Sequence, residues 1–120
     1  MMNQLARLKS LRAEIHATQF QIETLKAIAS DAKPNEVLKP LIAEDEVQLA
    51  DLQRELATLT GEVTNAICAV LTEPLTRKVI LAREVFGLPF DEVADRINRS
   101  SRWARKLHQR GLQQLTSAAR

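Results

Sequence analysis

Residues 90–115, FDEVADRINRSSRWARKLHQRGLQQL, contain the pattern that decides the fold of this chain. A short acidic segment at 91–97 has apolar residues at helical spacing, and a polar corner at 98–100 follows it. The stretch then becomes basic, because between Arg96 and Arg110 there are six Lys or Arg residues and no Asp or Glu. We therefore predict a short helix, a tight turn and a second, longer helix with a basic side.

The predicted second helix, residues 101–116, has two different sides. When successive residues are placed about 100° apart around the helix axis, apolar and small side chains gather on one of them. That side is predicted to be buried, and it contains Ala104, Leu107, His108, Gly111, Leu112 and Leu115. The opposite side is polar and basic, and it contains Arg102, Arg105, Lys106, Gln109 and Arg110. Ser100 is suited to cap the helix, and Trp103 lies at the border between the two sides.

A basic side that begins at a helix N-terminus, after a short helix and a tight turn, is typical of helix-turn-helix proteins, which insert that helix into the major groove of DNA. Arg102 and Arg105 are the candidates for base contacts because arginine pairs bidentately with guanine. Ser101 is expected to hydrogen-bond a base or a phosphate, and the other basic residues are expected to neutralise phosphates. The full predicted set of DNA-binding residues is Arg77, Lys78, Arg99, Ser101, Arg102, Arg105, Lys106, Gln109 and Arg110.

A simpler interpretation of such a side is a solvated helix face without a ligand. The unbroken run of positive charge beside the turn pattern favours DNA, and so does the charge of the whole chain. Residues 1–73 have a net charge of −4, whereas residues 74–120 have a net charge of +6, which suits a polyanionic partner. Trp103 is interpreted as a packing residue, and His108 as a hydrogen-bonded core histidine rather than a catalytic one.

A third helix is predicted just before this pair. Thr72 is suited to cap it, Pro74 to lie near its first turn, and the helix is expected to end near Val85. Gly87 stands where glycine commonly terminates a helix. Arg77 and Lys78 would lie near the start of this helix, within reach of the flanking DNA backbone.

Two long amphipathic helices are predicted in the N-terminal half, at residues 1–29 and 42–71. Apolar residues recur at every seventh position in both, which is a heptad pattern. The first series is Leu8, Ile15, Ile22 and Ala29, and the second is Ile42, Leu49, Leu56, Val63 and Val70. Turn-forming residues at 30–35 separate the helices, so we predict an antiparallel hairpin. Pro40 either opens the second helix or lies in the first turn of a helix that starts near Asn35.

Some residues interrupt or broaden this pattern. Asp45 is out of place at a seam position and suggests a wet or frayed helix end, while Gly61 is expected to allow a close neighbour or a slight bend. Leu5, Phe20 and Ile28 lie off the narrow seam and are expected to widen the apolar face. Since two helices alone cannot bury such wide faces, we predict dimerisation through this hairpin. A plain intramolecular bundle is the alternative.

The composition argues against several other classes of protein. Only three Gly, four Pro and no Tyr are present, which favours helix nearly throughout. Cys68 is the only cysteine, no Cys or His stands at metal-ligand spacing, and the glycines form no phosphate-binding loop. We therefore expect no metal, no cofactor and no enzymatic activity. The chain has no signal-peptide pattern and no apolar run of about 18 residues, so we expect a cytoplasmic protein without membrane contact.

Residues 67–115 resemble the region-4-type helix-turn-helix of bacterial sigma factors. More closely, they resemble small phage and prophage proteins that contain such a domain, a group that includes late-gene transcription regulators. The matching motifs are TEPLTRKVIL at 72–81, Gly87-Leu88, FDEVADRI at 90–97, Ser100-Ser101-Arg102-Trp103, Lys106-Leu107-His108 and Gly111-Leu112. The chain departs from those relatives at Ala104 and Arg105, where they commonly have a bulky apolar residue or tyrosine.

The resemblance implies a transcription regulator in the cytoplasm of a bacterial host cell, with RNA polymerase as a further partner. Together with the residue patterns, it predicts an all-α protein with two parts. Residues 1–71 would form an antiparallel helical hairpin, a coiled-coil-like oligomerisation arm, and residues 72–120 a helix-turn-helix domain. That domain would bind double-stranded DNA through helix 101–116, as a homodimer joined by the N-terminal helices.

Two other functions remain open at this point. A phage packaging or assembly adaptor, similar to a small terminase subunit, also combines a helix-turn-helix with helical arms. Such subunits usually have the DNA domain first, whereas it is last here. A module that binds RNA polymerase without gripping DNA is the other possibility.

Overall fold

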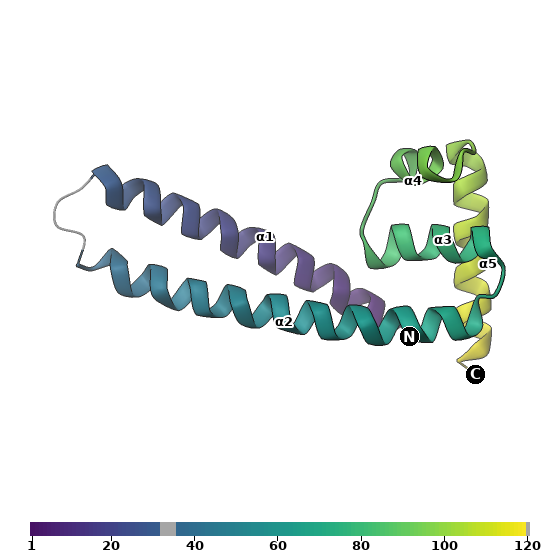
Figure 1. Ribbon diagram of the computed structural model, residues 1–120, viewed down its shortest axis with the longest axis horizontal. Coiled ribbons are helices and arrows are strands. Elements are labelled where there is room, and N and C mark those ends of the chain that lie inside the picture. Colours follow the sequence, from purple (N-terminus) through teal and green to yellow (C-terminus); the bar gives the residue numbers. More distant parts are fainter. Residues whose placement is uncertain (32–35, 120) are drawn as a thin grey trace. The chain divides into compact units, whose positions relative to one another are not determined.

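The computed structural model describes residues 1–31 and 36–119, and every regular element in this part is a helix (Figure 1). The elements are α1 (Met2–Asp31), α2 (Leu38–Val70), α3 (Pro74–Ile80), a π-helical turn η1 (Leu81–Val85), α4 (Phe90–Ile97) and α5 (Ser101–Ala118). The predicted all-α fold is confirmed. The predicted turn chemistry at Pro34 and Asn35 lies outside the described residues.

The chain divides into two compact units, residues 1–9 with 59–120, and residues 10–58. The ends of α1 and α2 therefore belong to the same unit as α3, α4 and α5. The functional boundary between residues 71 and 72 stays a prediction.

Within residues 10–58, α1 and α2 run antiparallel (Figure 1), and the predicted seam lies between them. Ile15 and Ile22 are buried on α1, and Ile42 and Leu49 are half-buried on α2. The polar seam residue Asp45 is also half-buried, and its Oδ2 accepts a 2.6 Å hydrogen bond from Gln21 on the other helix. This partner explains how an acid is tolerated at a seam position.

The first turn of α2 answers the question that Pro40 leaves open in the sequence. The helix begins at Leu38, so Pro40 is its third residue and lies in the first turn. Proline is tolerated there because the first N–H groups of a helix have no partner within the helix.

The expected widening of the apolar face is wrong for two of the three residues. Leu5 is buried, but Phe20 is 71% exposed and Ile28 is 50% exposed. Phe20 follows Ile15 by five positions, which places it on the far side of the helix from the seam at about 100° per residue.

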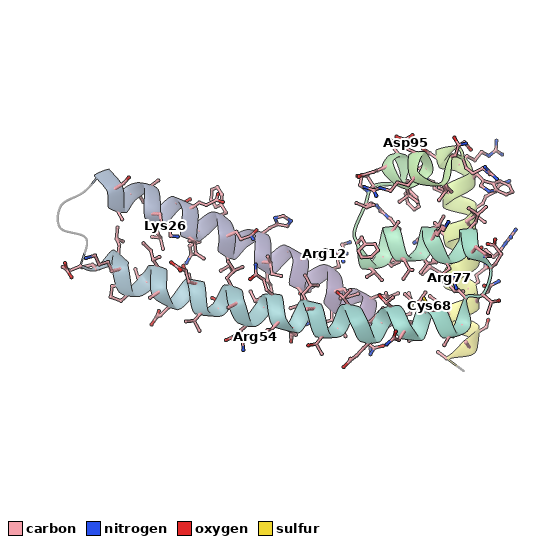
Figure 2. All side chains as sticks on the ribbon, viewed as in Figure 1. Arg12, Lys26, Arg54, Cys68, Arg77 and Asp95 are labelled. Atoms are coloured by element: carbon pink, nitrogen blue, oxygen red, sulfur yellow. The ribbon has the colours of Figure 1, made fainter. Side chains whose placement is uncertain are left out.

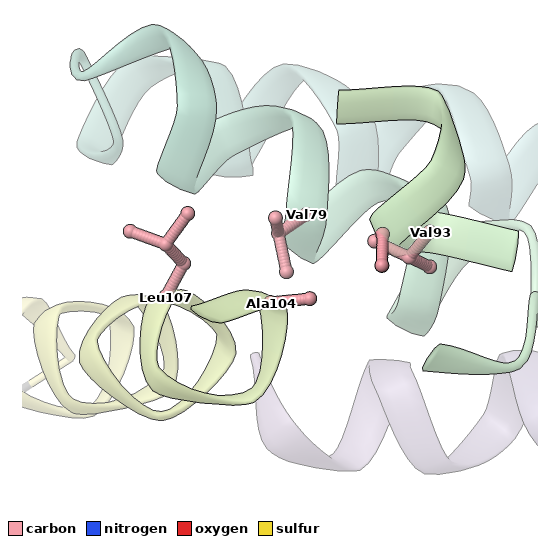
Figure 3. Packing of buried hydrophobic residues seen from close by; sticks show 5 residues of the cluster. Val79, Val93, Ala104 and Leu107 are labelled. Atoms are coloured by element: carbon pink, nitrogen blue, oxygen red, sulfur yellow. The ribbon is translucent and has the colours of Figure 1, made fainter. Parts of the chain in front are cut away.

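One core cluster of the other unit is built where α3, α4 and α5 meet. Val79, Val93, Ala94, Ala104 and Leu107 form one buried cluster (Figure 3). The helices approach closely at Gly111, because a Cβ atom there would overlap the side chain of Ile80 and lie 3.1 Å from Cγ2 of Thr76. Gly61 has no such role, since a Cβ atom there would meet nothing within 4 Å. The expectation of a close neighbour at Gly61 is wrong.

The start and end of the third predicted helix differ in detail from the sequence-based expectation. Pro74 is the first residue of α3, but Glu73 caps the helix and the predicted cap, Thr72, does not. The Glu73 carboxylate accepts hydrogen bonds from the backbone N–H groups of Leu75 and Thr76 and from the Thr76 hydroxyl. The predicted end near Val85 is confirmed, although the last five residues form a π-helical turn. Gly87 follows with φ of 70°, as a terminating glycine should.

Candidate nucleic-acid interface

A three-residue turn joins α4 to α5, and each of its residues has a clear local role. Asn98 adopts the left-handed conformation, with φ of 57° and ψ of 47°, which asparagine tolerates better than most residues. The backbone N–H of Arg99 then donates to the carbonyl of Ala94 at 3.0 Å, which closes the end of α4. The hydroxyl of Ser100 accepts a 3.1 Å hydrogen bond from the backbone N–H of Trp103. The predicted cap of α5 is confirmed.

The buried side of α5 is the predicted one. Ala104, Leu107, Gly111 and Leu115 are buried, and His108 and Leu112 are half-buried beside them. Trp103 is 41% exposed, in agreement with its predicted place at the border.

The other side of α5 is exposed along its length. The residues on it are Arg102, Arg105, Lys106, Gln109 and Arg110, as the sequence predicts. None of the four basic side chains forms an ion pair with another residue that the structure describes. By contrast, Arg96 at the end of α4 pairs with Glu92 at 3.0 Å. The basic residues on the exposed side of α5 therefore have no ion-pair partner among the described residues.

An acidic group lies at the N-terminal end of this exposed side. The hydroxyl of Ser101 donates a 2.7 Å hydrogen bond to Oδ1 of Asp91, at the start of α4. While that bond is formed, Ser101 can accept a hydrogen bond but cannot donate one to a phosphate. Arg99 is exposed, and its Nη1 donates to the carbonyl of Asn98 at 3.0 Å.

The ring of Phe90 makes a cation–π contact with the guanidinium of Arg105. The Arg105 guanidinium carbon lies 5.1 Å from the ring centroid, and that of Arg83 lies 4.4 Å from the same centroid. The imidazole of His108 meets the ring edge-on, with centroids 5.2 Å apart. Phe90 thus orders the guanidinium that the sequence singles out for base contacts, through cation–π attraction. The sequence contains a Phe where α4 begins, but no local pattern predicts that its ring contacts Arg105 of α5.

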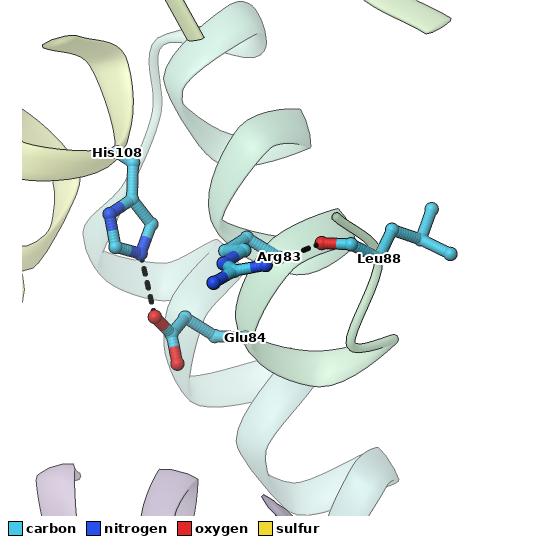
Figure 4. A network of polar contacts seen from close by, with 4 residues as sticks. All are labelled: Arg83, Glu84, Leu88 and His108. Carbon is cyan, nitrogen blue, oxygen red and sulfur yellow. Dashed lines mark hydrogen bonds and ion pairs between the residues drawn. The ribbon is translucent and has the colours of Figure 1, made fainter. Parts of the chain in front are cut away.

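His108 is fixed by a polar contact to the π-helical turn. Its Nε2 lies 2.6 Å from Oε1 of Glu84, and Nη1 of the neighbouring Arg83 donates to the carbonyl of Leu88 at 3.0 Å (Figure 4). The interpretation of His108 as a hydrogen-bonded histidine is confirmed. The contact links the middle of α5 to the segment that precedes α4, so it holds the exposed basic side in place.

The two predicted residues on α3 do not share one environment. Lys78 is exposed and lines an apolar hollow together with Phe86, Leu88 and Arg96, and no residue of α5 lines that hollow. Arg77, one residue earlier on the same helix, is half-buried (Figure 2). The roles of Arg77 and Lys78 in DNA binding stay predictions.

Arg110 lies close enough to the capping glutamate of α3 for their charges to interact. The hydroxyl and backbone N–H of Thr76 and the backbone N–H of Leu75 hold the pKa of Glu73 below its ordinary value of 4.5. The positive charge of Arg110 contributes a smaller effect in the same direction. The charge of Arg110, at the end of the basic side furthest from the turn, therefore acts on the residue that caps α3.

Other kinds of site have little support in the described residues. Across residues 1–31 and 36–119, no three His, Cys, Asp or Glu side chains gather where they could hold a metal ion. No helix in the same ranges is long and apolar enough to cross a membrane. Comparison of the chain with protein-family models, with curated proteins and with solved structures found no match. An assignment of function to this chain therefore depends on the geometry and charge of the exposed side of α5.

Proposed function

We propose that this chain is a sequence-specific transcription regulator that binds duplex DNA by inserting α5 into the major groove. The observation that supports the proposal best is the exposed side of α5, whose four basic residues have no ion-pair partner among the described residues. This side begins in the first turn of the helix, directly after the three-residue turn from α4. The major groove is about 12 Å wide and admits one α-helix.

The positions along α5 suggest how the contacts are divided. Arg102 lies in the first turn of the helix, where helix-turn-helix proteins contact base edges. Arg105 is the second candidate for a base contact, because the Phe90 ring restricts its guanidinium and so lowers the entropy lost on binding. Lys106 and Arg110 lie one and two helical turns after Arg102. They would neutralise phosphates and fix the orientation of the helix.

The oligomeric state and the biological setting are parts of the same proposal. A dimer joined by the N-terminal helices would place two copies of α5 on two half-sites, which raises both affinity and specificity. The exposed apolar side chains of α1, Phe20 above all, favour such a partner. The sequence resemblance to phage and prophage regulators supports a role in transcription in a bacterial host, with RNA polymerase as a second partner.

Fluorescence anisotropy with labelled duplex DNA at several salt concentrations tests the proposal. We expect the logarithm of affinity to fall linearly with the logarithm of salt concentration, with a slope of about −0.9 for each phosphate neutralised. The triple variant Arg102→Ala, Arg105→Ala, Lys106→Ala should bind more weakly and with a shallower slope. Selection of a binding sequence from random duplexes would then test specificity, because a sequence-independent binder enriches none.

A matched control separates the site from net charge. Lys9→Ala, Lys26→Ala, Lys39→Ala removes the same number of positive charges from exposed positions on α1 and α2. We expect this control to retain most of the affinity and the salt slope. If both triple variants lose affinity equally, the binding is a general effect of charge and α5 is not the interface. If the folded wild-type chain shows no salt-dependent binding, the proposal is wrong.

A further inference from the structure

The side of α1 that points away from α2 has an unusual composition between Ser10 and Ala27. Residues on this side follow one another at intervals of three or four, so they lie in one line along the helix. They are Ser10, Ala13, Ala17, Phe20, Thr24 and Ala27, and we name them the outer stripe. All six are exposed and none is charged, in a chain of which 27% of the residues are charged.

The outer stripe combines one large apolar side chain with small ones. Phe20 is 71% exposed, and Ile28, which is 50% exposed, borders the stripe. The small residues on either side of Phe20 would let another helix approach closely, and Phe20 would then be covered. The stripe itself contains no charged residue, and exposed carboxylates, Glu14 and Glu23, flank it.

The outer side of α2 differs in this respect. Val47 is also exposed there, at 64%. However, Lys39 and Glu46 line the same shallow hollow as Val47, and Arg54 follows one heptad after it. The line of residues through Val47 on α2 thus includes a charged residue, Arg54, whereas the outer stripe of α1 includes none.

We propose that the outer stripe of α1 packs antiparallel against the outer stripe of a second copy of this chain, with Phe20 of each copy over Ala17 of the other. The proposal names the surface that forms the dimer in the proposed function, and it rests on that part of the proposed function alone. It does not depend on whether α5 binds DNA.

The sizes of the side chains favour the antiparallel arrangement. When Phe20 lies over Ala17 of the second copy, each layer of the contact pairs a larger residue with a smaller one or two small ones. The next layers pair Ala13 with Thr24, and Ala27 with Ser10. In a parallel pair, Phe20 would instead meet Phe20 while Ala17 met Ala17, so the helices would be held apart at one layer and leave a gap at the next.

The flanking charges select one register of the antiparallel pair. In the proposed register, His16 lies beside Glu23 of the second copy, and Glu14 lies beside Gln21. Sliding one copy by a heptad in one direction brings Glu14 against Glu14. Sliding it in the other direction brings Glu23 against Glu23. Like charges directly opposite each other are destabilising, so only the proposed register of the three avoids them near the symmetry axis.

Sedimentation of the full chain over a concentration series tests whether this surface forms the dimer. We expect wild type to pass from monomer to dimer in the micromolar range, because a contact between two helices is small by the standard of stable interfaces. Phe20→Glu should raise the dissociation constant at least tenfold, with unchanged helix content by circular dichroism. Val47→Glu, which introduces the same charge at an exposed apolar position on α2, should leave the dimer intact.

The outcomes separate this proposal from the DNA-binding proposal. A wild-type chain that stays monomeric at all concentrations would overturn the dimer and leave the outer stripe to a different partner, whatever the DNA measurements show. A dimer that is lost with Val47→Glu but kept with Phe20→Glu would overturn the choice of surface. Loss of DNA binding by a chain that still dimerises through Phe20 would leave this inference intact.

Disulfide formation tests the direction and the register. In a Cys68→Ser background, an Ala13→Cys variant and a Thr24→Cys variant should form a disulfide when mixed. Neither should form one alone, because in each case the two cysteines would lie about 16 Å apart along the axis, at 1.5 Å per residue. A disulfide requires Cα atoms within about 7 Å. Cross-linking of Ala13→Cys with itself would show a parallel pair, and an intact dimer that cross-links in no sample would overturn the register.

Discussion

The hydroxyl of Ser101, the first residue of α5, donates a 2.7 Å hydrogen bond to the carboxylate of Asp91 near the start of α4. The first turn of a helix has unpaired N–H groups and a partial positive charge, which make it a good site for an anion. In this protein the first turn of α5 lies next to the Asp91 carboxylate. A DNA phosphate or base edge that approaches α5 must compete with this negative charge.

We expect Asp91→Asn to bind duplex DNA more tightly than wild type. Removal of one negative charge within a few Å of a phosphate is worth about 1 kcal/mol in water, so affinity should rise about threefold to tenfold at low salt. Anisotropy titrations measure the change.

Asp95→Asn is the control for this change, because Asp95 is an exposed residue of α4 with the same charge (Figure 2). The Asp95→Asn variant should show a smaller gain. Equal gains for the two variants would mean that net charge alone matters and that Asp91 does not face the ligand.

Much of the fold follows from periodic patterns that need no knowledge of tertiary contacts. The heptads place Ile15 and Ile22 in the seam, and the 100° periodicity of residues 101–116 separates Ala104 and Leu115 from the basic side. Helix caps were less predictable. Thr72 and Glu73 are both able to accept hydrogen bonds from a helix start, and only the backbone geometry decides that Glu73 does so.

The parts of the site that could not be predicted are contacts between segments distant in the sequence. Nothing in the local sequence pattern indicates that Glu84 forms a hydrogen bond with His108, or that the Phe90 ring makes a cation–π contact with Arg105. The exposure of Phe20 has another cause. A widened apolar face predicts that this aromatic residue is buried, but its angular position on α1 is opposite the seam, and it is 71% exposed.

We expect His108 and Glu84 to be energetically coupled. Replacing His108 with alanine leaves a partly buried carboxylate without this partner, so the variant should lose about 1–3 kcal/mol of unfolding free energy. A double-mutant cycle with Glu84→Ala, measured by urea denaturation, should give a coupling of about 0.5–3 kcal/mol. Additive effects of the two substitutions would contradict the contact.

The two helical glycines should respond to alanine with opposite signs. Gly61→Ala should raise the unfolding free energy by about 1 kcal/mol, because alanine favours helix and a Cβ atom at this position meets nothing within 4 Å. Denaturant unfolding of the variant and wild type measures the difference.

Gly111→Ala gains the same helix propensity but introduces an overlap with Ile80. Overpacking of a core typically costs about 1–3 kcal/mol, so we expect the net effect to be destabilising. Gly61→Ala serves as the control, since the difference between the two variants isolates the overlap. If Gly111→Ala were equally stabilising, α3 and α5 would not approach as closely at that point.

The capping carboxylate of Glu73 should make stability depend on pH in the acid range. Its pKa in the folded chain is below the ordinary value of 4.5, chiefly because the Thr76 hydroxyl and backbone N–H donate to it. A group with a lowered pKa stabilises the fold at pH values above its ordinary pKa, and this contribution disappears as the pH falls through the folded value. Thermal unfolding followed by circular dichroism between about pH 3 and pH 7 should therefore show a smaller loss on acidification for Glu73→Gln than for wild type. Glu73→Gln should also unfold at a lower temperature near neutral pH, because its single carbonyl oxygen cannot replace two oxygens that accept three hydrogen bonds.

Glu62→Gln, at an exposed position on α2, is the control and should follow the wild-type curve. Parallel curves for Glu73→Gln and wild type would show that this cap does not set the acid response.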